Sequence, residues 1–196
     1  LIRNIDRDGS HPVSVYISDE YRRAARGGTG AAKTGGNYAA SMIAAEEAKS
    51  KGYVQVLWID SAEGKYVEEV GTMNIMFVYE GKKIVTPKLT GSILAGITRD
   101  SLLKMAPDLG YEVSEEMIEV EQMLADIESG KITEVFGCGT AVVISPVGRF
   151  GYKGKDYVID EDNVGPVAQR LFDELTAIQY GRKEDPYGWT LKIEVA

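Results

Sequence analysis

The sequence is poor in the residues that carry most metal and thiol chemistry. It has one histidine, His11, and one cysteine, Cys138, so a histidine-based catalytic triad, a histidine and cysteine metal cluster and an internal disulfide are all excluded. A lone cysteine is typical of a reducing compartment, and we predict a cytoplasmic location. Because no histidine is near Cys138 in the sequence, we expect a small buried side chain there and no nucleophile.

Positive charge and long apolar segments are also scarce. Lys and Arg number 22 against 30 Asp and Glu, which gives a net charge of −8. We therefore expect neither nucleic acid nor an anionic membrane as a partner. No apolar run approaches the roughly 20 residues that a membrane span needs. A chain of 196 residues, 44% of them hydrophobic, can bury one substantial core, so we predict one domain over residues 1–196.

Strand and helix patterns alternate irregularly along the chain. Apolar alternation predicts strands at 13–17, 54–59, 72–79, 84–87, 111–118, 132–136 and 141–145. Helical spacing predicts helices at 37–51, 97–108, 120–129 and 164–179. Since this order is not a regular βαβ repeat, a doubly wound sheet is disfavoured and a mixed α+β domain is expected.

The stretch from Gly27 to Tyr38, GGTGAAKTGGNY, places five glycines around a single lysine, Lys33. Glycines at this density lose much backbone entropy on folding, and they are used where the chain needs positive φ or approaches a ligand closely. A lysine in such a loop is either a phosphate-binding cation or a covalent catalyst that attacks a carbonyl.

A nucleotide-binding P-loop fits this stretch poorly. The Walker motif is G-x-x-x-x-G-K-[ST]. When it is aligned from Gly27, Ala32 occupies the position of the glycine that precedes the lysine. The apolar run 54–59 that ends at Asp60 imitates a strand followed by a metal-binding aspartate. A P-loop directly follows a buried strand, however, and the residues before Gly27 are basic and polar. We therefore favour the covalent lysine.

Three motifs follow Lys33 in order. Tyr38 lies five residues on, EVGTMN occupies 69–74 and GITR occupies 96–99. With them the chain resembles the large domain of branched-chain amino acid aminotransferases, which are fold type IV enzymes that use pyridoxal 5′-phosphate (PLP). The resemblance implies a curved, barrel-like arrangement of mixed sheets flanked by helices. It also implies transamination of leucine, isoleucine and valine with 2-oxoglutarate, small amino acids and 2-oxo acids as substrates, and a homodimer.

The resemblance assigns the catalytic and ring-binding residues. Lys33 forms the covalent link to the cofactor and then moves the proton of the 1,3-shift. Tyr38 meets the phenolic oxygen of the cofactor, and Glu69 keeps the pyridine nitrogen protonated, which makes the ring an electron sink. Glu68 is expected to point to the opposite face of its strand. Thr72 is expected near the cofactor or the substrate carboxylate.

Two further segments are assigned to anions. Gly96, Ile97 and Thr98 open a predicted helix, whose first amides are expected to bind the cofactor phosphate. Arg99 is interpreted as a surface residue. The stretch 137–141, GCGTA, is interpreted as a tight turn between strands. By resemblance its Thr140 contacts the phosphate, and Thr140 and Ala141 receive the substrate carboxylate.

Other functions stay open. Aminotransferases for D-amino acids and aminodeoxychorismate lyases share the lysine, the glutamate and the phosphate turn. A non-catalytic binding or dimerisation module is a further alternative, although a pure scaffold does not need a lysine among glycines. Members of the family have a smaller N-terminal domain that lacks a counterpart here, and the chain begins Leu1-Ile2 without methionine. We expect it to be a truncated large domain that turns over slowly or not at all.

Overall fold

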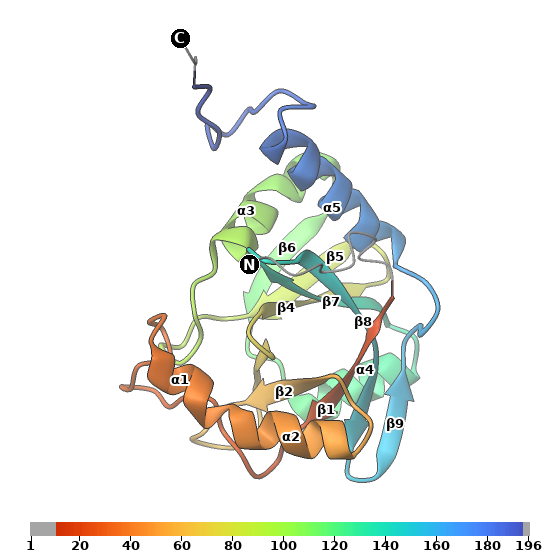
Figure 1. Ribbon diagram of the computed structural model, residues 1–196. Coiled ribbons are helices and arrows are strands. Elements are labelled where there is room, and N and C mark those ends of the chain that lie inside the picture. The colour runs from red at the N-terminus through yellow and green to blue at the C-terminus, as the bar shows by residue number, and fades with distance from the viewer. Residues whose placement is uncertain (1–10, 194–196) are drawn as a thin grey trace.

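The computed structural model describes residues 11–193, in which one curled sheet of nine strands is flanked by helices (Figure 1). The strands are β1 Val13–Ile17, β2 Gln55–Ile59, β3 Val67–Val70, β4 Asn74–Tyr79, β5 Lys83–Pro87, β6 Glu112–Glu116, β7 Ile132–Gly139, β8 Val143–Tyr152 and β9 Lys155–Val158. Their order in the sheet is β3-β2-β1-β8-β7-β4-β5-β6, and β9 pairs with β8. Parallel and antiparallel pairs both occur, as in β1–β2 and β4–β7.

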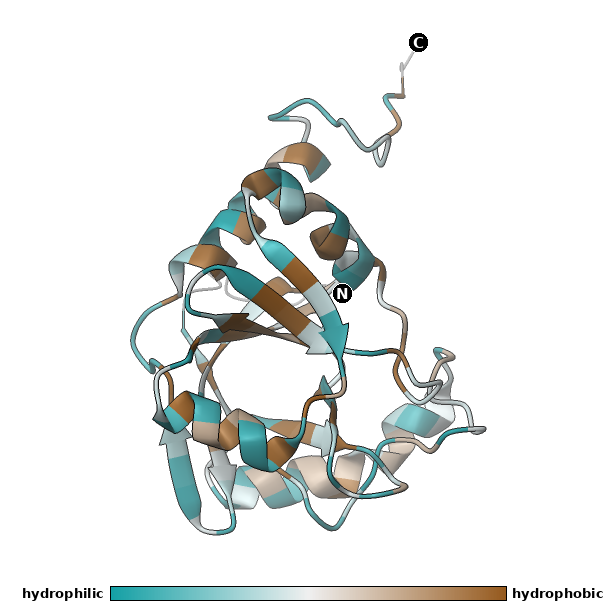
Figure 2. Ribbon diagram, turned by 180° about the vertical axis from the view of Figure 1, so that it is seen from behind, coloured by the Kyte–Doolittle hydropathy of each residue, from teal (hydrophilic) through white to brown (hydrophobic). Residues whose placement is uncertain are grey.

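The helices cover both faces of this sheet. They are α1 Gly35–Ala40, α2 Met42–Ser50, α3 Ile97–Met105, the 3-10 helix η1 Pro107–Leu109, α4 Val120–Glu128 and α5 Pro166–Gln179. Figures 1 and 2 show α2 and α4 on opposite sides of β1 and β2, while α3 and α5 lie together over β4 and β7. Within residues 11–193 we find no helix long and apolar enough to cross a membrane.

Strand alternation explains this layering. In β2, Leu57 and Ile59 face a central core that includes residues of α4, whereas Val56 and Trp58 face α2. In β4, the 75 and 77 side chains join the central core, and the 76 and 78 side chains pack with α3 and α5. Both strands are therefore apolar on both faces, because each separates two cores.

Among the predicted boundaries that are wrong, two bear on the expected site residues. The helix expected at 37–51 is interrupted at Ser41, whose Oγ donates to the carbonyl of Tyr38 at 2.7 Å and separates α1 from α2. The turn expected at 137–141 lies later, because β7 continues to Gly139 and β8 begins at Val143. Gly137 therefore lies within β7 and not in a turn, and a Cβ there would lie 2.8 Å from Met73 Cε.

Candidate functional site

Glu69 lies near the end of β3 and is only 3% exposed. Trp58 pairs with Glu69 and Ile59 pairs with Val67, so Glu68 is the extra residue of a β-bulge. The expectation that Glu68 points to the opposite face is wrong, because the bulge breaks the alternation. Both carboxylates reach the segment 92–96, which we call the strap. Ser92 Oγ donates to Glu68, and the Leu94 N–H donates to Glu69 at 2.6 Å.

Arg23 is the partner of Glu69 that the sequence did not reveal. Its Nε lies 3.1 Å from Glu69 Oε2, and its Nη2 donates to the carbonyls of Gly30, at 3.1 Å, and of Ser92. Burial raises the pKa of Glu69 to about 7, although Arg23 and the Leu94 N–H act in the opposite direction. A second cation beside Glu69, in addition to Arg23, would favour its ionised form. The basic residues before the glycine loop were the only sequence signal for Arg23.

The loop that carries Lys33 is held by a buried asparagine. Asn37 Nδ2 donates to the carbonyls of Thr29, at 2.8 Å, and Ala32, at 3.0 Å, while Thr29 Oγ1 donates to Asn37 Oδ1 at 2.7 Å. Gly30 touches the strap so closely that a Cβ would lie 2.3 Å from the Ser92 oxygen. The loop backbone is thus fixed on both sides, and Lys33 itself is exposed.

A small pocket of about 10 Å³ joins three of the expected residues, Tyr38, Glu69 and Thr72. Its other lining residues are Arg23, Ala32, Asn37, Ser41, Gly71 and Leu94. Tyr38 is 38% exposed, and Thr72 lies in an exposed turn just before β4, outside the strand predicted for it. Lys33 follows Ala32 directly, so the structure brings the lysine loop, the phenol and the buried carboxylate to one place.

The strap ends at the N-terminus of α3. Gly96 is the N-cap, and among the described residues no side chain caps this end. The first intrahelical bond runs from the Asp100 N–H to the Gly96 carbonyl, so the amides of Ile97 and Thr98 precede the helical ladder. Ile97 is exposed and Thr98 is buried. The interpretation of Arg99 as a surface residue is wrong: it is 4% exposed, because it donates to the Pro87 carbonyl and pairs with Glu115.

The turn from β7 to β8 exposes Thr140 and Ala141. It lies near the strap because Asn74, the first residue of β4, pairs with Cys138 and also donates to the Leu94 carbonyl at 2.8 Å. Cys138 is buried, which raises its pKa to about 12 and agrees with the prediction of an inert thiol. Neither turn residue, nor Lys33, Ile97 or Thr98, is among the described residues that line the small pocket.

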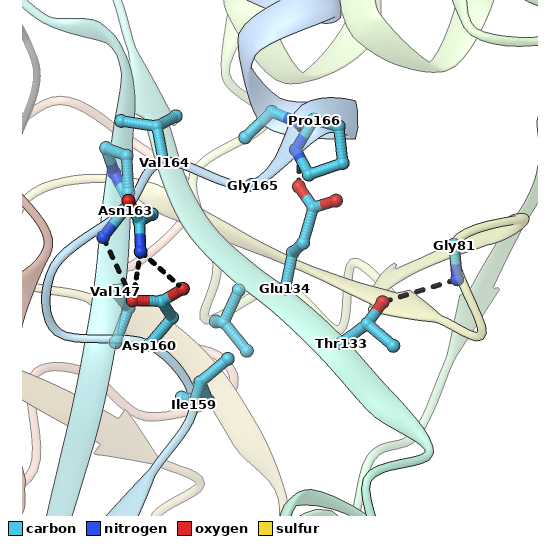
Figure 3. A pocket seen from close by; sticks show the side chains of 13 residues that line it. Gly81, Thr133, Glu134, Val147, Ile159, Asp160, Asn163, Val164, Gly165 and Pro166 are labelled. Carbon is cyan, nitrogen blue, oxygen red and sulfur yellow. Dashed lines mark hydrogen bonds between the residues drawn. The ribbon is translucent and has the colours of Figure 1, made fainter.

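A larger pocket of about 360 Å³ lies elsewhere, between β7, β8 and the start of α5. Figure 3 shows Glu134 in it, pointing toward Gly165 and Pro166. The Glu134 carboxylate accepts the N–H groups of Val167, at 3.0 Å, and Ala168, at 2.9 Å, and so caps α5. Its acceptors are used for the fold, and none of the expected site residues lies here.

Asp60, the aspartate of the rejected P-loop interpretation, is also structural. It accepts four backbone N–H groups, from Ala62, Glu63, Lys65 and Tyr66, at 2.7 to 3.1 Å. Burial alone would raise the pKa of this carboxyl, but these hydrogen bonds lower it. The carboxylate organises a turn after β2 and has little capacity left for a metal ion.

Comparison with known proteins identifies the family. Residues 3–150 match the model of class IV aminotransferases. The chain belongs to this family. Over 181 residues it is 53% identical to a probable branched-chain-amino-acid aminotransferase of Staphylococcus epidermidis, covering 92% of this chain and 50% of that protein. It is 46% identical over 186 residues to the branched-chain-amino-acid transaminase 1 of Bacillus subtilis, covering 95% of this chain and 52% of the relative. The chain thus spans about half the length of these relatives.

Solved structures agree. The branched-chain amino acid aminotransferase of Escherichia coli superposes with a TM-score of 0.77 at 33% identity, covering 92% of this chain and 55% of the other. The enzyme of Thermobaculum terrenum in its PLP form gives 0.77 at 28% identity, covering 90% and 54%. The predicted family and its curved, mixed fold are confirmed.

The residues of this class IV aminotransferase fit PLP, the cofactor of its family. Glu69 is a buried carboxylate suited to a cationic ring nitrogen. The buried Nε of Arg23 lies 3.1 Å from Glu69 Oε2 but makes no hydrogen bond of good geometry within residues 11–193. The uncapped start of α3 offers amides to an anion.

Proposed function

We propose that this chain is the PLP-binding large domain of a branched-chain amino acid aminotransferase, which transfers the amino group of leucine, isoleucine or valine to 2-oxoglutarate. The observation that carries the proposal is the convergence of the Lys33 loop on the buried pair of Arg23 and Glu69 in one small pocket. The names of the relatives at 46 to 54% identity support this substrate class.

Each residue has a task in this proposal. When bound, PLP supplies an aldehyde that condenses with amines and a ring that accepts electrons. Lys33 Nζ holds the cofactor and later moves the proton between the two carbons of the 1,3-shift. Tyr38 donates from its hydroxyl to the phenolic oxygen. Glu69 holds the proton on the ring nitrogen, and Arg23 and the Leu94 N–H keep this carboxylate oriented.

The anion-binding residues come from two separate segments. The amides of Ile97 and Thr98 bind the cofactor phosphate, and Gly96 permits its close approach. Thr140 adds a contact to the phosphate and, with Ala141, receives the substrate carboxylate. Thr72 borders the space between ring and substrate. The exposure of Thr72, Thr140 and Ala141 supports these roles, because ligands reach them without rearrangement of the core.

Partners and location are part of the proposal. We place the protein in the cytoplasm as a homodimer that acts on small amino acids and 2-oxo acids. Support for the dimer comes from α2, where Met42 is 67% and Ile43 is 62% exposed beside the site. Side chains of this size are usually covered when they lie together at a surface.

The test is a visible absorbance scan of the chain with added PLP, then borohydride reduction and peptide mapping. We expect a yellow species whose reduced adduct maps to Lys33 and is absent in Lys33→Ala. Lys82→Ala, a change in the exposed turn before β5, is the matched control and should keep the adduct. An adduct spread over surface lysines would contradict the proposal. A panel of 2-oxo acids with L- and D-amino donors then tests the substrate class.

A further inference from the structure

The two segments proposed for the phosphate are far apart in sequence, and one side chain lies between them. The start of α3 follows the strap at Gly96, and the β7–β8 turn begins at Thr140. Asn74 is 6% exposed and starts β4 between them. A phosphate that is bound by both segments needs a fixed spacing between them, because hydrogen bonds weaken steeply with misalignment.

Asn74 reaches both segments. Its backbone pairs with Cys138 in β7, two residues before Thr140. Its side-chain Nδ2 donates to the Leu94 carbonyl at 2.8 Å, two residues before Gly96. One residue therefore joins the end of β7, which leads into the turn, to the strap, which leads into the helix.

Gly96 and Asn74 are matched in shape. A Cβ at Gly96 would lie 2.2 Å from Asn74 Oδ1, which is closer than real Cβ atoms approach another atom, and 3.4 Å from Asn74 Cγ. The φ of Gly96 is −70°, which any residue can adopt, so the glycine is needed for the close approach and not for its backbone conformation. The asparagine amide thus packs directly against the first residue of the anion-binding helix end.

We propose that Asn74 is a positioning residue for the cofactor phosphate: it sets the distance between the α3 N-terminus and the Thr140 turn without itself contacting the ligand. This inference rests on the proposed function. Asparagine suits the task because its amide donates to a carbonyl, whereas aspartate in the same place would put a carboxylate against that carbonyl. Alanine would leave the Leu94 carbonyl without its donor.

The test compares two ligands that differ only in the phosphate, PLP and pyridoxal, each titrated into the purified chain and followed by visible absorbance. We expect Asn74→Ala to weaken PLP affinity about tenfold and pyridoxal affinity less than about twofold. The matched control is Asn37→Ala, a second buried asparagine that holds the Lys33 loop. It should weaken both ligands equally, because the lysine meets the aldehyde that both carry.

A double-mutant cycle tests the contact itself. Gly96→Ala alone should weaken PLP binding, because the new methyl group displaces the asparagine amide. In Asn74→Ala/Gly96→Ala the clash is gone, so the combined loss should be smaller than the sum of the two single losses. Thermal unfolding without ligand checks that each variant is folded. If Asn74→Ala does not fold, Asn74→Asp keeps the size and still removes the donor.

The outcomes distinguish a failure of the positioning role of Asn74 from a failure of the proposed function. If the parent chain binds PLP and Asn74→Ala weakens PLP and pyridoxal alike, or if the two single losses add, the positioning role is wrong while the proposed function stands. If the parent chain binds no PLP at any concentration, the positioning role of Asn74 and the proposed function are both wrong. A selective loss for PLP with a non-additive cycle supports the inference.

Discussion

Glu69 and Glu134 are both buried glutamates that accept backbone N–H groups, yet only one of them belongs to the candidate site. Glu134 uses both oxygens on α5, at 3.0 and 2.9 Å, in the larger pocket. Glu69 accepts one backbone N–H with one oxygen, and its other oxygen lies 3.1 Å from the Nε of Arg23. Burial and pocket size therefore do not distinguish the two carboxylates. Their partners do, because Glu134 commits both oxygens to a helix end, whereas Glu69 faces a guanidinium in the candidate site.

The largest expected effect is a loss of activity when the charge of Glu69 is removed. Glu69→Gln keeps the volume and removes the charge, so transamination should fall about 100-fold or more, since a neutral amide cannot hold the ring nitrogen protonated. Steady-state transamination rates measure it, with Glu134→Gln as the control of equal chemistry. Equal losses in the two variants would show that both act only through folding.

For Glu134 we expect a loss of stability and little change in cofactor binding, the opposite of what we expect for Glu69. Glu134→Ala leaves the Val167 and Ala168 amides at the start of α5 without acceptors, so the free energy of unfolding should decrease by about 2 to 4 kcal/mol. Chemical denaturation measures this loss. PLP affinity of the folded protein should change by less than about twofold, because Glu134 lies in a pocket that contains none of the expected site residues. A twofold change corresponds to less free energy than one hydrogen bond contributes. A strong loss of PLP affinity would mean that the larger pocket communicates with the site.

A smaller effect is expected in the pH dependence of stability without cofactor. Burial raises the pKa of Glu69 from 4.5 to about 7, so between these values the unfolded chain loses this proton while the folded chain keeps it. Stability should therefore fall as the pH rises through this window, by at most about 3 kcal/mol. Glu69→Gln should remove this slope. Denaturation of the parent chain and the variant at several pH values gives the difference directly, and parallel curves would contradict the raised pKa.

Much of the fold followed from local patterns. The alternation at 13–17 predicted β1 with its observed bounds, and the spacing over 164–179 predicted all of α5, beginning two residues too early. One error lies at Ser41, whose hydroxyl bonds the Tyr38 carbonyl where the predicted helix is interrupted. Another lies at Gly137, which was expected in a turn but pairs with Ile75 and Ser145 inside the sheet. Glycine by itself does not say whether it serves a turn or a contact.

The site was predicted unevenly for a related reason. Lys33, Tyr38 and Glu69 belong to short motifs, and motifs can be recognised without a structure. Arg23, Asn37 and Asn74 act on residues that are distant in sequence, such as the strap at 92–96. Their partners are defined only when the chain is folded. The roles assigned to the motif residues stay predictions until cofactor binding is measured.

The sequence by itself determined the family, the mixed class of the fold and the lysine on which the proposed chemistry depends, because these rest on residue types in a fixed order. Only the tertiary structure decided which buried polar groups support that lysine. A β-bulge turned Glu68 and Glu69 toward the same strap, and the curled sheet brought Arg23 to the carboxylate. Such pairings depend on strand register and on the close approach of distant segments, which become visible only when the whole chain is folded.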